Sequence, residues 1–144
     1  MSEQVIDASV AIKWIVKDES FRDKARQLLR NARLNGIILC GPPLLEYEVE
    51  SAIQYRLFRG RSTVVAADTS LNAFHNVGVR IFTHPDMVYR AREIGRQFNQ
   101  ERIYDSIYAA LAQLRNCEFW TADKAFYDAV KSTLLYVKYL PDYH

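Results

Sequence analysis

Short apolar runs alternate with longer helical patterns along nearly the whole chain. The runs have the length of buried strands and lie at 5–7, 37–40, 79–82, 118–121 and 134–137. Between them, apolar residues recur at helical spacing over 9–16, 21–34, 43–60, 62–75, 84–98, from Asp105 onward and over 123–130. Strands that alternate with helices pair in parallel, with helices on both faces. The sequence therefore predicts a three-layer α/β/α sandwich around a mainly parallel sheet of about five strands.

Bulk composition narrows the class of protein without naming a function. The 144 residues are 49% hydrophobic and 25% charged, and no linker or repeat interrupts them, so we expect one domain over 1–144. A net charge of +2 permits nucleic-acid binding but does not argue for it. Nucleotide-binding P-loops, dinucleotide-binding glycine motifs and serine-hydrolase motifs are absent from the sequence.

The N-terminal residues and the two cysteines both bear on where in the cell the protein acts. Residues 1–4 have neither a basic region nor an apolar core typical of a signal peptide, and no apolar run has the length of a membrane span. Cys40 and Cys117 lie in separate apolar stretches, which favours buried free thiols over the alternative of one disulfide. We therefore expect a cytoplasmic protein.

Three aspartates are predicted to meet at one edge of the sheet. Asp7 ends the first strand, and Asp123 lies just past the carboxyl end of the strand at 118–121. Carboxyl ends of parallel strands share an edge, where ligands bind in open α/β folds. Asp105 opens the helix that leads into the strand at 118–121, so it starts at the same edge. One difficulty is that the helix ending near Phe98 should finish at the opposite edge, which leaves residues 99–104 to cross about 20 Å.

A fourth acid is harder to choose from the residues alone. Glu46, Glu48 and Glu50 follow one another in the helix at 43–60, with Glu48 at one border of the apolar stripe and the other two at the opposite border. A helical wheel does not select among them. Each acid taken singly also has a simple structural interpretation, as a helix cap or as part of a solvated face. The alternative function is accordingly a non-catalytic α/β binding module whose acids are helix caps.

Four blocks of sequence resemble the PIN-domain nucleases and come in that family's order. They read VIDASVAIKW at 5–14, PPLLEYEVESAI at 42–53, YDSIYAALA at 104–112 and FWTADKAF at 119–126. Within the family, the chain is most similar to the VapC-type toxins of prokaryotic toxin–antitoxin pairs. The chain departs from the family at 100–103, where a small or glycine-containing approach is usual, so the cleft beside Asp105 is expected to differ in shape.

The resemblance implies a set of site residues. The family's acidic quartet corresponds to Asp7, Glu48, Asp105 and Asp123, with the E-V-x-S-A pattern selecting Glu48. Ser9 and Thr121 match positions that support the site by hydrogen bonding. Clustered carboxylates repel one another, and a hard cation such as Mg²⁺ or Mn²⁺ relieves that repulsion. The sequence leaves open whether one or two ions act.

The implied activity is that of a metal-dependent endoribonuclease that leaves a 5′-phosphate. Basic residues near the cleft, Lys13, Arg56 and Lys124, are candidates to neutralise RNA phosphates, although such side chains are commonly just solvated. The resemblance also implies a homodimer and a small antitoxin partner. A segment of that antitoxin would cover an apolar groove and block the acidic cleft.

Overall fold

The computed structural model describes residues 2–144, and its centre is a five-stranded sheet in which every neighbouring pair is parallel. The strands are arranged in the order β3-β2-β1-β4-β5. Their bounds are Glu3–Ile6 for β1, Ile38–Gly41 for β2, Arg80–Ile81 for β3, Glu118–Thr121 for β4 and Val137–Tyr139 for β5. The parallel five-stranded sheet predicted from the alternating pattern is confirmed.

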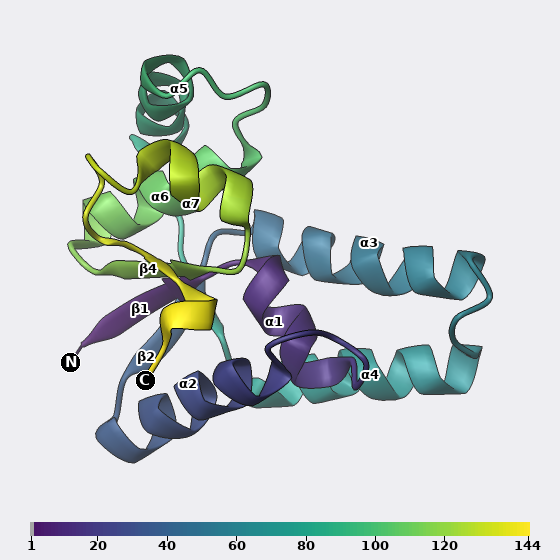
Figure 1. Cartoon of the computed structure of the whole chain (residues 1–144). Helices are drawn as coiled ribbons and strands as arrows, with labels where there is room; N and C mark the ends of the chain where they lie inside the picture. Colours follow the sequence, from purple (N-terminus) through teal and green to yellow (C-terminus); the bar gives the residue numbers. More distant parts are fainter. Residues whose placement is uncertain (1) are drawn as a thin grey trace.

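Helices cover both faces of this sheet (Figure 1). One layer contains α1 and α2, and the other contains α6 and α7, with α5 packed on the outer side of α6. The bounds are Ala8–Ile15 for α1, Arg22–Asn35 for α2, Leu44–Phe58 for α3, Val64–Val77 for α4, Met87–Gln97 for α5, Tyr104–Arg115 for α6 and Lys124–Val130 for α7. The short 3-10 helix η1, Leu140–Asp142, follows β5. The chain thus forms the predicted three-layer sandwich.

The second half of the central strand β1 is completely buried, whereas Glu3 and Gln4 in its first half are partly exposed. Val5 and Ile6 have no exposed surface, and Phe119 on the neighbouring β4 is equally buried. These buried positions are apolar because helices cover both faces of the sheet there. The polar residue that follows, Asp7, is where the backbone leaves the sheet and α1 begins.

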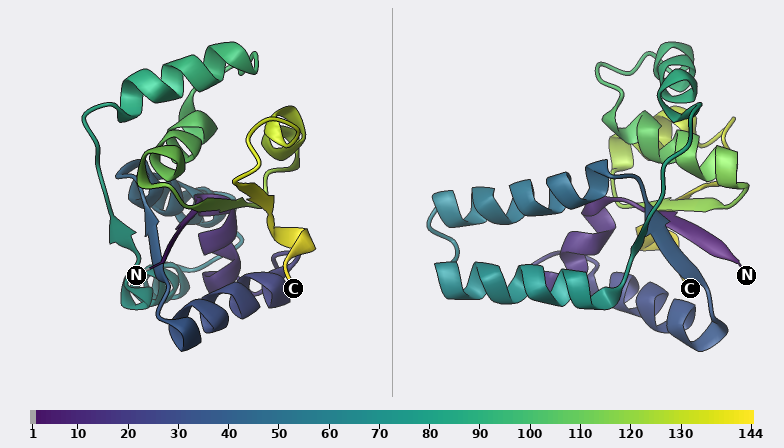
Figure 2. Two further views of the ribbon diagram at one scale, coloured as in Figure 1. Left: turned by 90° about the vertical axis from the view of Figure 1, so that its left-hand side faces the viewer. Right: turned by 180° about the vertical axis from the view of Figure 1, so that it is seen from behind.

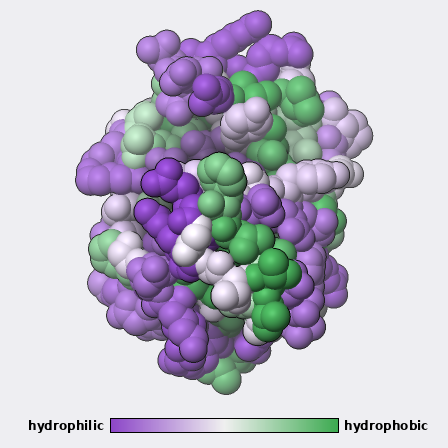
Figure 3. All heavy atoms as spheres, turned by 90° about the vertical axis from the view of Figure 1, so that its right-hand side faces the viewer, coloured by the Kyte–Doolittle hydropathy of each residue, from purple (hydrophilic) through white to green (hydrophobic). Residues whose placement is uncertain are grey.

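Helices α3 and α4 form an antiparallel pair that extends beyond the carboxyl edge of the sheet (Figures 1 and 2). Viewed from that side, apolar side chains gather on part of the surface (Figure 3). Phe58 at the end of α3 and Val64 and Val65 at the start of α4 are 81%, 62% and 77% exposed. We call these three residues the tip patch.

The difficulty with the segment before Asp105 is resolved by the direction of α5. This helix is seen almost along its axis in Figure 1 and side-on in the left panel of Figure 2, so it lies across α6. It therefore does not finish at the amino edge, and residues 98–103 need not cross the whole sheet. The two helices also approach closely, since a Cβ added to Gly95 would lie 3.2 Å from the Ile103 side chain.

The last strand differs from its predicted position. The apolar run at 134–137 predicts a strand, but β5 begins only at Val137. Leu134 is buried in the turn that ends α7, where its amide donates to the carbonyl of Val130 at 2.8 Å. A short apolar run shows that residues are buried but does not show whether a turn or a strand buries them.

Two smaller expectations are also settled. Cys40 is buried, Cys117 is partly buried, and both are free thiols, so the disulfide alternative is not realised. Among the helices of residues 2–144, none combines the length and the apolar character needed to cross a membrane.

Candidate active site

The four predicted acids come from four different elements and meet at the carboxyl edge. Asp7 follows β1, Asp123 follows β4, Asp105 lies in the first turn of α6 and Glu48 lies within α3. Strands β1 and β4 are direct neighbours with Ile6 opposite Trp120, so their ends are level. The carboxyl group of Asp105 is close enough to the other three acids for the negative charge of each to raise its pKa.

Asp7 is the most enclosed of the four acids, with 4% of its surface exposed. Its Oδ1 accepts hydrogen bonds from Ser9 Oγ at 2.5 Å and from the amide of Val10 at 3.2 Å, and its Oδ2 accepts one from Thr121 Oγ1 at 2.5 Å. Burial raises the pKa of Asp7 to about 6, although these donors favour the charged form. The buried surroundings of Asp7 thus disfavour the charged form of its carboxyl group.

Ser9 and Thr121 connect Asp7 to the start of α7. Ser9 Oγ accepts from the amide of Ala122 at 2.9 Å, and Thr121 Oγ1 accepts from the amide of Asp123 at 3.0 Å. Each hydroxyl therefore donates to Asp7 and accepts from the backbone beside Asp123. This arrangement fixes the ends of β1 and β4 relative to each other.

Asp105 has the most crowded electrostatic surroundings of the quartet. Burial is the main cause that raises its pKa to about 7, followed by the charges of Asp123, Asp7 and Glu48 and by a hydrogen bond with Asp123. A carboxyl group with this pKa carries a proton in a large share of molecules at neutral pH. A cation among these acids would displace that proton and relieve the repulsion.

Glu48 is the acid of α3 that faces the site. It is half-buried, whereas Glu46 and Glu50 are exposed. Its Oε1 accepts a hydrogen bond from the hydroxyl of Tyr108, and burial raises its pKa while this bond lowers it. The structure thus makes the choice among the three glutamates that the helical wheel left open.

Tyr108 is a residue near the site that the sequence interpretation missed. It lies three positions after Asp105 in α6, on the same face of the helix, and its side chain is completely buried. Small apolar residues follow it in the sequence: Ala109, Ala110 and Ala112. A large hydroxyl-bearing side chain at the start of such a run, three residues from a predicted site acid, is a signal in the sequence that could have identified it.

The basic residues considered for phosphate contacts each have an acidic partner. Lys13 is buried, with its ammonium 3.5 Å from Glu19, and Arg56 lies 3.2 Å from Asp18. Lys124 follows Asp123 directly, but its ammonium is 2.6 Å from Asp128 on the same helix.

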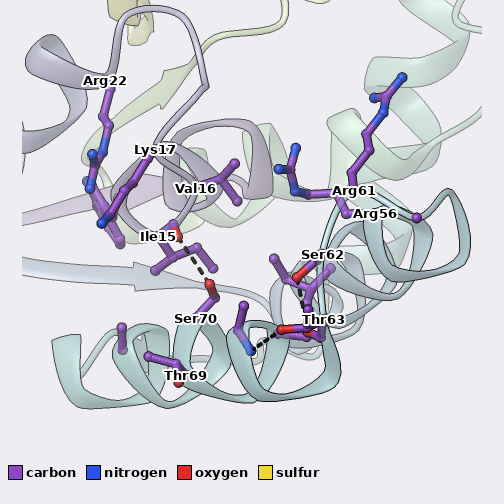
Figure 4. Close-up of a pocket in the computed structure, with 16 residues that line it drawn as sticks. Ile15, Val16, Lys17, Arg22, Arg56, Arg61, Ser62, Thr63, Thr69 and Ser70 are labelled. Atoms are coloured by element: carbon purple, nitrogen blue, oxygen red, sulfur yellow. Dashed lines mark hydrogen bonds between the residues drawn. The ribbon is translucent and has the colours of Figure 1, made fainter.

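A separate cavity of about 770 Å³ lies between the end of α1 and the α3–α4 pair (Figure 4). Its apolar wall includes Trp14, Val16 and Ile53, and its hydroxyl groups come from residues of α4 and the turn before it. Its cationic residues are Lys17, Arg22, Arg56 and Arg61. The Nε atom of Arg22 is buried and has no hydrogen-bond partner among residues 2–144.

The donor set of the acidic cluster fits a hard divalent cation. Carboxylate oxygens are the ligands that Mg²⁺ and Mn²⁺ prefer. Within residues 2–144, no three acidic, histidine or cysteine side chains stand in an arrangement that would ligate an ion directly. Mg²⁺ itself keeps several waters and is commonly bound by only one or two carboxylates together with substrate phosphates, so its binding does not require three direct protein ligands.

Comparisons with known proteins show which family the sequence matches. The model of the PIN domain family matches residues 5–131. Over 119 residues the chain is 29% identical to a VapC ribonuclease of Mycobacterium bovis and to ribonuclease VapC9 of Mycobacterium tuberculosis. The aligned residues cover 83% of this chain and 84% of each relative.

The fold is also similar to that of a solved structure. The crystal structure of PAE2754 from Pyrobaculum aerophilum superimposes with a TM-score of 0.65 and covers 93% of this chain and 95% of that one. At 18% sequence identity, this likeness concerns the fold alone.

Proposed function

The chain belongs to the PIN-domain family, and from this premise we propose that it is a metal-dependent endoribonuclease, the toxin of a toxin–antitoxin pair. The observation that carries the proposal is the meeting of four carboxylates from separate elements, with the pKa values of Asp7 and Asp105 raised to about 6 and 7. The ribonuclease names of the VapC relatives indicate RNA as the substrate.

The helix-cap alternative accounts for only half of the cluster. Asp7 and Asp123 do cap α1 and α7, each accepting from a backbone amide of the first turn. Asp105 lies in the first turn of α6 without serving as its cap, and Glu48 is inside α3. Caps alone give no reason for four acids to be brought together against their mutual repulsion.

The residues present suggest how the site would work. A divalent cation bound here would supply Lewis acidity toward the scissile phosphate and lower the pKa of a water that attacks it. Asp7, Glu48, Asp105 and Asp123 would hold that cation together with its bound waters, while Ser9 and Thr121 keep Asp7 in place. The covering of Asp7 by protein excludes bulk water from one side of the cluster, which strengthens the electrostatic interactions there.

The cavity between α1 and the α3–α4 pair supports the proposal of an antitoxin partner. It combines an apolar wall with four cationic residues, among them Arg22, Arg56 and Arg61 (Figure 4), and none of the four acids lines it. A segment that carries apolar and acidic side chains would complement both features. We propose that the antitoxin binds here and continues from this cavity to the acidic cluster.

A second copy of the chain is the proposed occupant of the tip patch. Phe58, Val64 and Val65 are largely exposed at the end of the α3–α4 pair, and exposed apolar clusters commonly mark interfaces. In a homodimer formed there, each copy would keep a complete acidic cluster made only of its own residues. The free thiols agree with the proposal that the toxin acts in the reducing cytoplasm, where its RNA substrates are.

The experiment that tests the function compares Glu48→Gln with Glu46→Gln. Both changes remove one negative charge from α3, but only Glu48 faces the cluster. We expect the wild-type protein, purified without antitoxin, to cleave RNA with Mg²⁺ or Mn²⁺ and not with EDTA. Glu48→Gln should lose roughly 100-fold or more of this activity, because electrostatic groups at a reacting centre contribute that much, and Glu46→Gln should retain it.

Two results would contradict the proposal. Cleavage that persists in EDTA would show that no metal is needed, and equal cleavage by wild type and Glu48→Gln would show that the activity belongs to another site or to a contaminant. A protein that neither cleaves any RNA tested nor binds Mn²⁺ would support the non-catalytic binding module.

A further inference from the structure

The hydroxyl of Tyr108 has an unusual place for a core residue. The ring is fully buried in α6 and stacks on Phe119 of β4, with ring centroids 5.7 Å apart and an angle of 12° between the planes. From this fixed position the hydroxyl donates to Oε1 of Glu48 on α3. A packed, buried side chain therefore contacts the acid of the cluster that has the longest side chain.

The acids of the cluster differ in how they are held. Asp7 receives three hydrogen bonds, from Ser9, Val10 and Thr121. Glu48 has a longer side chain with more rotatable bonds, and Tyr108 is the donor that contacts its carboxylate. A carboxylate that ligates a metal works best when an outer hydrogen bond fixes its orientation.

We propose that Tyr108 is a positioning residue of the active site, one that fixes the Glu48 carboxylate by engaging Oε1. This inference rests on the proposed metal-dependent function and adds to it a residue outside the acidic quartet. The hydroxyl does not contact substrate or the reacting atoms, and it acts through Glu48. Its ring packing against Phe119 supplies the rigidity that this task requires.

The chain offers a matched control for a purely structural tyrosine. Tyr136 is also partly enclosed against α6, and its hydroxyl donates to the backbone carbonyl of Ala109 at 3.0 Å. Removing either hydroxyl deletes one hydrogen bond to the same region of the protein. Only the bond from Tyr108 ends on a proposed metal ligand.

The test measures Mn²⁺ binding by calorimetry for wild type, Tyr108→Phe and Tyr136→Phe, without RNA. Each protein is studied at a temperature at which circular dichroism shows it folded. We expect Tyr108→Phe to bind Mn²⁺ about tenfold more weakly, at the lower end of the effect of losing an outer-sphere partner of a metal ligand. Tyr136→Phe should bind within twofold of wild type, and Glu48→Gln should bind at least as weakly as Tyr108→Phe.

The outcomes separate this inference from the function on which it rests. Wild-type binding by Tyr108→Phe, together with weakened binding by Glu48→Gln, would overturn the role of Tyr108 and leave the metal site intact. Equal weakening in both tyrosine variants would overturn it as well, because a general structural effect would then explain the loss. Absence of Mn²⁺ binding by the wild-type protein would overturn the metal site and the positioning role together.

Discussion

The acidic cluster and the cavity beside the α3–α4 pair are built in opposite ways. In the cluster, carboxylates are brought together in buried surroundings that raise the pKa of Asp7 and Asp105, so the fold works against their charges. In the cavity, four cationic residues border an apolar wall, and one of them, Arg56, lies 3.2 Å from the carboxylate of Asp18. The cluster is therefore suited to bind a small cation tightly, and the cavity is suited to bind a chain segment over a larger area.

The first consequence of this contrast concerns stability without metal. Folding raises the pKa of Asp7 from 3.8 to about 6, so the folded protein favours the neutral carboxyl group. The contribution of Asp7 to the free energy of unfolding is therefore fully present at low pH, where the group is neutral. It is lost as the pH rises through about 6, and Asp105 extends the loss toward 7. The shift of Asp7 corresponds to about 3 kcal/mol as an order of magnitude.

Denaturant unfolding in EDTA of wild type and Asp7→Asn measures this effect. We expect the two proteins to have similar free energies of unfolding near pH 4. Toward pH 8, Asp7→Asn should become the more stable by up to about 3 kcal/mol. If the difference in free energy of unfolding between the two proteins does not change with pH, the charge of Asp7 does not destabilise the metal-free fold. The acidic cluster would then not oppose the charges of its own acids as described above.

The second consequence concerns the cavity and is smaller. Ala66 lines it from α4, so Ala66→Trp should fill part of the space without touching the acids. We expect cleavage without antitoxin to stay within twofold of wild type. The concentration of antitoxin that halves the activity should rise roughly tenfold, because the added side chain occupies space that the antitoxin segment would fill; a tenfold change corresponds to about 1.4 kcal/mol of binding free energy.

An inhibition assay with the purified antitoxin gives this result directly. The control variant is Ala122→Ser. Ala122 lies beside the acids and does not line the cavity, so this variant changes the acidic region and leaves the cavity as it is. Unchanged inhibition of Ala66→Trp would mean that the antitoxin binds elsewhere. The proposed separation, with catalysis at the acidic cluster and antitoxin binding at the cavity, would then be wrong.

Much of the cluster could be predicted from residues because strand ends are easy to find. Asp7 and Asp123 follow two apolar runs whose parallel pairing the alternating pattern indicates, and Asp105 is placed by the helix between them. The sequence pattern alone did not choose Glu48, because its position depends on how α3 is rotated against α6. The family resemblance made that choice, and the contact with Tyr108 gives the physical reason.

Other features depended on packing that no local pattern describes. The crosswise direction of α5 follows from its close approach to the segment before α6, where Gly95 faces Ile103. The shift of β5 by three residues reflects the burial of Leu134 in a turn. The family resemblance implied an apolar groove, but the place of the cavity was not predicted, because its lining residues come from α1, α2, α3, α4 and the segments between them.

The most direct test of the central claim is to locate Mn²⁺ in a crystal by its anomalous scattering. We predict a peak among the carboxylates of Asp7, Glu48, Asp105 and Asp123 in the wild-type protein, and its loss in Asp7→Asn. A peak at that position would show that the four acids form a metal site. A well-diffracting wild-type crystal with saturating Mn²⁺ and no peak there would contradict the account.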